Sequence, residues 1–150
     1  MMKIYFSISV FENSPHCIPA DFDYCYWLKL MNRFITRADT IEIHCWEEEK
    51  EVIEELKRRY SEFDEIPNSL SLVYFRGEMT DKKKEYLVTD FVNKHRQLKW
   101  FSIFLYKKDT CIFSSEHWGT EFYGEAMTAA DVEFIKSVLT EENTISVIDE

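Results

Sequence analysis

Two kinds of hydrophobic pattern alternate along this chain, and their alternation limits the folds it can adopt. In residues 4–10 and 41–46, apolar side chains occupy every second position, which is typical of strands with one buried face. In residues 22–34, 47–63 and 82–98, apolar side chains recur at helical spacing. The pattern predicts an α/β fold with a mixed, mainly parallel central sheet packed by helices, in the order β-α-β-α-β-α-β-β-α-β.

The segment 100–106 is almost continuously apolar, a pattern typical of a strand in the middle of a sheet. We therefore expect an inner strand there, followed by a turn and a hairpin partner at 111–115. Thr128 and Asp131 have the spacing of a capping box and predict the start of the last helix. No repeat or long linker divides the 150 residues, so we expect residues 1–150 to form one domain.

Charge is unevenly distributed along the sequence, whose formal net charge is −10. Residues 41–65 carry a net charge of −6 and residues 111–150 a net charge of −8, whereas residues 66–110 carry +4. Binding to nucleic acid phosphates requires clustered Lys and Arg, so this balance disfavours nucleic acid as a direct partner. A plain contribution to solubility is the alternative explanation for the negative charge.

The sequence favours a reducing, cytoplasmic location. Its first residues lack the pattern of a signal peptide, and no stretch approaches the ~20 apolar residues of a membrane span. The cysteines are scattered, without a C-x-x-C pair, and we expect all of them to be free thiols: Cys17, Cys25, Cys45 and Cys111.

Motifs for cofactors and metals are incomplete in this sequence. Gly119 and Gly124 are spaced like the glycines of a phosphate-binding loop, but Glu125 and Ala126 follow them where Lys and Ser or Thr are required. His44 and Cys45 are adjacent on an expected strand, so their side chains point to opposite faces and cannot easily share an ion. We therefore expect no cofactor and no metal.

An alternative hypothesis is a small cytosolic hydrolase or transferase. Sites in parallel sheets lie beyond the carboxyl ends of the strands. In this sequence those ends offer candidate acid and base residues, namely Glu12, His16, Glu47, Glu48, Arg76 and Glu78. The simpler interpretation is that the glutamates favour the dipole of the following helix. His95 lies on the apolar face of the expected third helix and is interpreted as a packed core residue.

The segment 116–125 interleaves carboxylates with aromatic side chains and contains no Lys or Arg. Aromatic residues anchor many protein interfaces, and the charges around them steer association. The competing interpretation is that its aromatic residues fill the core while the glutamates stay solvated. The segment predicts a partner-binding surface at Glu116, Trp118, Glu121, Tyr123 and Glu125, with a secondary rim on the second helix at Glu48, Glu51 and Glu55.

The chain resembles the immunity proteins of bacterial polymorphic-toxin and contact-dependent growth inhibition systems. The resemblance covers its size, its acidity, its aromatic content and the order of a strand, Trp118, Thr120, Glu121 and a helix near the C-terminus. Such proteins are cytosolic α/β domains that bind and neutralise a cognate toxin, often a basic nuclease. The resemblance implies a stoichiometric inhibitor without turnover, whose partner is a basic protein toxin domain. It assigns no role to any single residue.

Overall fold

The computed structural model describes residues 1–9, 24–140 and 143–149. Its elements, in chain order, are β1 (Met2–Ser7), α1 (Cys25–Phe34), a 3₁₀ turn (Ile35–Arg37), β2 (Thr40–Trp46), α2 (Lys50–Arg59), β3 (Asp64–Ile66), β4 (Leu72–Glu78), α3 (Asp81–Thr89), β5 (Ser102–Lys107), β6 (Thr110–Glu116), β7 (Glu121–Met127), α4 (Ala129–Val138) and β8 (Thr144–Asp149).

The strands form one sheet in the order β3-β4-β2-β5-β6-β7-β1-β8, and every neighbouring pair is antiparallel. The prediction of a mainly parallel sheet is therefore wrong. Each helix does connect strands that run in the same direction, as α4 connects β7 to β8. At least one other strand lies between the two connected strands in every case, as β1 lies between β7 and β8. The expected order omitted β3 and β7, so two expected strand directions are wrong: β4 runs opposite to β2, and β8 runs opposite to β6. The helical pattern also carried no information about which strands are neighbours.

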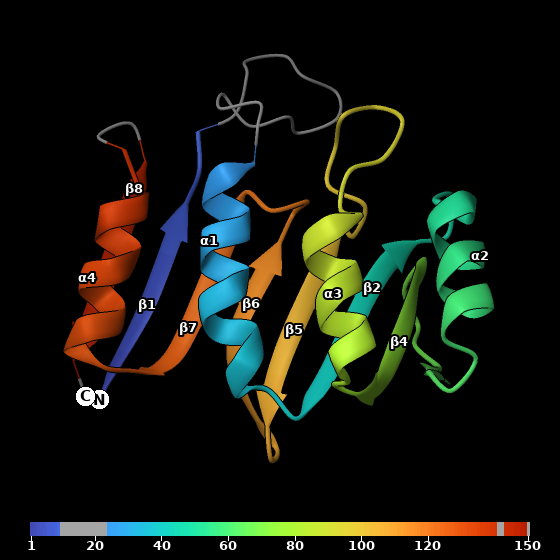
Figure 1. Ribbon diagram of the computed structural model, residues 1–150, viewed down its shortest axis with the longest axis horizontal. Helices are drawn as coiled ribbons and strands as arrows, with labels where there is room; N and C mark the ends of the chain where they lie inside the picture. The colour runs from blue at the N-terminus through green and yellow to red at the C-terminus, as the bar shows by residue number, and fades with distance from the viewer. Residues whose placement is uncertain (10–23, 141–142, 150) are drawn as a thin grey trace.

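The helices lie side by side across one face of the sheet, so the described chain has two layers (Figure 1). The core fills the space between them. Alternate residues of β2, including Ile41 and Ile43, are buried against the helices, and Phe34 of α1 stacks on Phe113 of β6 with ring centres 4.3 Å apart. The described residues place no helix over the opposite face, which we call the uncovered face.

The expected inner strand at 100–106 is confirmed, because β5 lies between β2 and β6. Its side chains Ile103 and Leu105 are fully buried. The capping box of the last helix is confirmed as well. The Thr128 hydroxyl accepts a hydrogen bond from the Asp131 amide at 3.1 Å, and the Asp131 carboxylate accepts one from the Thr128 amide at 3.0 Å.

The expected helix at 82–98 is nearly twice as long as the helix observed there. Helix α3 ends at Thr89, and a loop follows in which Val92 and Leu98 form an isolated bridge. The Asn93 side chain accepts hydrogen bonds from the backbone amides of His95 and Gln97 at 2.8 and 3.1 Å. Such side-chain bonds compete with helical ones and hold the loop in a tight turn. His95 is consequently exposed, so its placement in the core was wrong.

No helix among the described residues is long and apolar enough to cross a membrane.

Candidate functional site

Most of the residues predicted from segment 116–125 lie together on the uncovered face. Glu121, Tyr123 and Glu125 occupy alternate positions of β7, whose intervening residues Phe122 and Gly124 are buried toward the helices. Glu116 of β6 is paired directly with Glu121. On the other side of β7, Tyr5 of β1 is paired with Tyr123. We call these five side chains the acidic strip: Tyr5, Glu116, Glu121, Tyr123 and Glu125.

The strip has an excess of negative charge. Lys3 forms an ion pair with Glu125 at 3.5 Å, and the His117 Nδ1 atom lies 2.6 Å from a Glu121 oxygen. Glu116 accepts a hydrogen bond from the neutral Ser114 hydroxyl at 2.8 Å. The pKa of the Tyr5 phenol is raised, chiefly because the phenol is partly buried. The negative charges of Glu121 and Glu116 raise it by smaller amounts. The strip therefore presents a negative potential to solvent beside exposed aromatic edges.

Trp118 lies apart from the strip, in the turn between β6 and β7. His117 and Trp118 both have positive φ, and the turn continues through Gly119 at φ +76°. A Cβ atom at Gly119 would lie 3.1 Å from side-chain atoms of Leu98 and Trp27, so the turn is packed closely against the core. This geometry directs the half-buried indole of Trp118 toward the start of α2.

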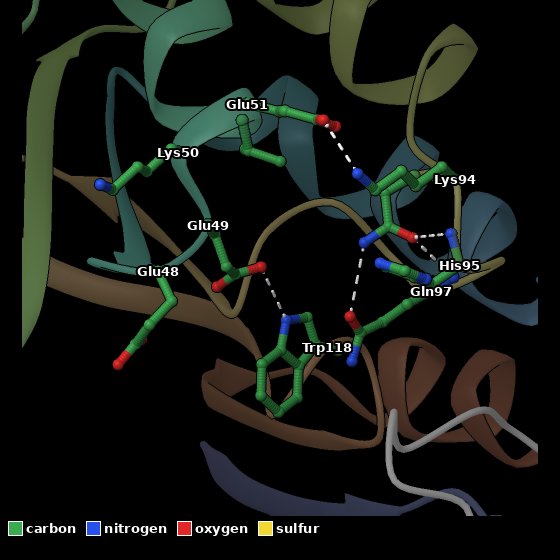
Figure 2. A pocket seen from close by; sticks show the side chains of 10 residues that line it. Glu48, Glu49, Lys50, Glu51, Lys94, His95, Gln97 and Trp118 are labelled. Atoms are coloured by element: carbon green, nitrogen blue, oxygen red, sulfur yellow. Dashed lines mark hydrogen bonds and ion pairs between the residues drawn. The ribbon is translucent and has the colours of Figure 1, made fainter.

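The Trp118 indole lines a hollow of about 420 Å³ (Figure 2). Its ring packs against Phe101, with centres 4.8 Å apart, and its Nε1 atom donates a hydrogen bond to the Glu49 carboxylate at 3.2 Å. Three segments form the walls, namely the residues that open α2, the loop after α3 and the β6–β7 turn. The lining residues are Glu48, Glu49, Lys50, Glu51, Val52, Asn93, Lys94, His95, Gln97 and Trp118.

The secondary rim predicted on α2 is only partly formed. Glu48 and Glu51 are exposed and line the hollow, where Glu51 forms an ion pair with Lys94 at 2.9 Å. Glu55 instead accepts hydrogen bonds from Tyr86 at 2.6 Å and from Lys99 at 2.9 Å. Its carboxylate is thus engaged by α3 and by the segment that follows α3, and it does not join the rim.

The residues of the enzyme hypothesis are not brought together. Because β2 and β4 are antiparallel, the carboxyl end of one strand lies beside the amino end of the other, and their carboxyl ends are separated by the length of the strands. Glu78 is paired with Thr40 at the start of β2, whereas Glu47 and Glu48 follow its end. Arg76 lies on the uncovered face, where its guanidinium covers the Tyr106 ring at 4.4 Å. The two remaining candidates, Glu12 and His16, lie outside the described residues.

Two of the described thiols, Cys45 and Cys111, are poorly suited to nucleophilic catalysis. Burial raises the pKa of Cys111 to about 11, and it also raises the pKa of the fully buried Cys45 well above its ordinary value. A cysteine nucleophile requires the opposite shift, because the thiolate is the reactive form. Within residues 1–9, 24–140 and 143–149, no three His, Cys, Asp or Glu side chains gather in a way that could hold a metal ion.

A second cluster on the uncovered face, centred on His44, was not predicted from the sequence. His44 stacks on Tyr74 with ring centres 3.7 Å apart and leans against Phe104 at 4.7 Å, while its Nε2 atom lies 3.5 Å from Glu42. The cluster spans β2, β4 and β5, beside the acidic strip. Burial lowers the pKa of His44 despite Glu42. The alternation in β2 was the available signal, because it places Glu42 and His44 on the face opposite Ile41 and Ile43.

The comparisons with known proteins found no match to this chain, whether among family models, curated proteins or solved structures.

Proposed function

We propose that this protein is an immunity protein, which binds a basic protein toxin domain stoichiometrically and neutralises it. The acidic strip on the uncovered face carries this proposal. It combines partly exposed carboxylates with aromatic side chains on an antiparallel sheet. Charged groups arranged in this way steer an oppositely charged partner toward the surface, and aromatic groups then slow its dissociation.

The strip and the hollow belong to one continuous region of the molecule. The β6–β7 turn joins them, because His117 contacts Glu121 of the strip while Trp118 contacts Glu49 of the hollow. The region therefore offers a flat part and a concave part to the same partner. Carboxylates in this arrangement resemble the phosphates that a nuclease binds, so an acidic surface is suited to covering such an active site.

Growth protection tests the proposal directly. We expect the C-terminal domain encoded by the reading frame directly upstream of this protein to arrest growth when expressed alone, and co-expression of this chain to restore growth. The double change Glu121→Lys with Glu125→Lys reverses the charge of the strip and should abolish protection at limiting expression, because it slows association.

The matched control is Glu54→Lys with Glu133→Lys, which makes the same change in net charge at exposed positions on helices α2 and α4. This control should protect as well as the unmodified chain. The proposal fails if the upstream domain does not arrest growth, or if the strip variant protects cells as well as the control variant does.

A further inference from the structure

The hollow beside Trp118 contains a carboxylate that has no counterion in the part of the chain that the structure describes. Glu49 is half-buried, and among the described residues no Lys, Arg or His lies within ion-pair distance of it. One carboxylate oxygen accepts a hydrogen bond from the Trp46 amide at 3.0 Å and the other accepts one from the Trp118 indole at 3.2 Å. A carboxylate can accept about four hydrogen bonds, so both oxygens retain acceptor capacity.

The cations around the hollow do not neutralise this carboxylate. Lys94 is held by Glu51 at 2.9 Å on the far wall. Lys50 extends away from Glu49 and from the interior of the hollow (Figure 2). Burial raises the pKa of Glu49, which means that the surroundings penalise its charge. A cation entering from outside would relieve that penalty.

The indole ring makes the hollow selective for a flat cation. Trp118 presents its ring to the hollow next to the Glu49 carboxylate (Figure 2). A guanidinium group stacks on aromatic rings and binds carboxylates through two parallel N–H bonds, whereas an ammonium group does neither as well. An anion would meet the carboxylates of Glu48, Glu49 and Glu51 in the same lining, so the hollow disfavours phosphate and carboxylate ligands.

We propose that the hollow is a socket for an arginine side chain of the basic partner, with the guanidinium bound to Glu49 and stacked on Trp118. This proposal rests on the proposed function, since it names the side chain of the toxin domain that the concave part of the surface takes. The socket deepens the interface at the β6–β7 turn, next to the acidic strip.

A titration of the isolated protein tests the socket without the partner. The probe is ethylguanidinium, and the control is ethylurea, which is neutral and has a similar shape. The signal is the NMR resonance of the Trp118 indole N–H. The resonance that disappears in the variant Trp118→Phe identifies it. We expect ethylguanidinium to shift this resonance saturably and ethylurea to leave it in place. Glu49→Gln should weaken the ethylguanidinium response at least about tenfold, because it removes the charged acceptor. Glu48→Gln should weaken it far less.

Equal responses to the two probes would overturn the socket, and so would a resonance that moves with inorganic phosphate instead. The comparison of probes on the unmodified chain decides the matter even if Glu49→Gln folds poorly.

Measurements with the toxin domain separate this proposal from the proposed function. We expect Trp118→Ala to weaken binding by roughly 30-fold, as for a buried aromatic anchor. If the strip variant abolishes protection while Glu49→Gln and Trp118→Ala bind with unchanged affinity, the socket is wrong and the proposed function stands. If ethylguanidinium binds as expected but the chain protects against no upstream toxin domain, the proposed function is wrong, and the hollow stands only as a guanidinium-binding site without the toxin as its partner.

Discussion

At the scale of single residues, Asp131 shows how one buried carboxylate holds several elements together. Its side chain is fully buried, caps α4 through Thr128, and binds Arg33 of α1 and Arg37 of the following turn at 3.0 and 2.7 Å. The hydrogen bonds from Arg37 hold the pKa of Asp131 well below its usual range. The helical layer is thus fastened at one side by a charged group, not only by apolar packing.

Replacement of Asp131 by Asn should destabilise the protein by about 3 kcal/mol at pH 7, because it removes the charge that two arginines share. The folded-state pKa is lower than the unfolded one, so this stabilisation is present above about pH 4 and is lost progressively as the pH falls below that value. Urea unfolding of both proteins at pH 7 and at lower pH measures it. A difference in free energy of unfolding that stays constant down to pH 3 would contradict this account of Asp131.

Residue-level signals also explain which site residues could be predicted. Glu121, Tyr123 and Glu125 share a face because they occupy alternate positions of β7. The sequence grouped them only by their mixture of carboxylates and aromatic rings, and the strand itself was not predicted. Glu55 also had the sequence signature of an exposed helical glutamate. Its engagement depends on Lys99 and Tyr86, which are distant in sequence and reach it only in the folded protein. No local pattern carries that information.

At the scale of elements, the sequence indicated most strands and helices but not their neighbours. Hydrophobic periodicity reports whether a segment is a helix or a strand and which of its faces is buried. It does not report that β2 lies between β4 and β5, or that the short, exposed strand β3 adds a reversal before β4. The order of strands is set by packing of the whole chain, and for this reason the parallel sheet was predicted wrongly.

The loop after α3 gives a prediction at this scale. Asn93→Ala removes the acceptor for the amides of His95 and Gln97 and should cost about 1–2 kcal/mol, because both amides lose a partner. Asn93→Asp keeps the acceptor oxygen and should cost less. Hydrogen exchange should show faster exchange of the amides of residues 95 and 97 in Asn93→Ala. Unchanged exchange there would mean that Asn93 does not hold this wall of the hollow.

At the scale of the whole molecule, the two faces of the sheet differ in what covers them. The helices bury one face of the sheet, with the core between the two layers, and the other face is left with carboxylates, aromatic rings and the stacked His44 cluster. With a net charge of −10, the molecule as a whole also attracts a basic partner before contact. We therefore place the proposed interface on the uncovered face.

Carboxylate labelling of the protein, alone and in complex with the upstream-encoded toxin domain, tests that placement most directly. A carbodiimide with an amine probe modifies exposed Asp and Glu side chains, and peptide mass spectrometry locates each modification. We expect labelling of Glu116, Glu121 and Glu125 to fall sharply in the complex, while labelling of Glu54 and Glu133 on the helical layer stays unchanged. Protection of the helical glutamates with continued labelling of the strip would contradict it.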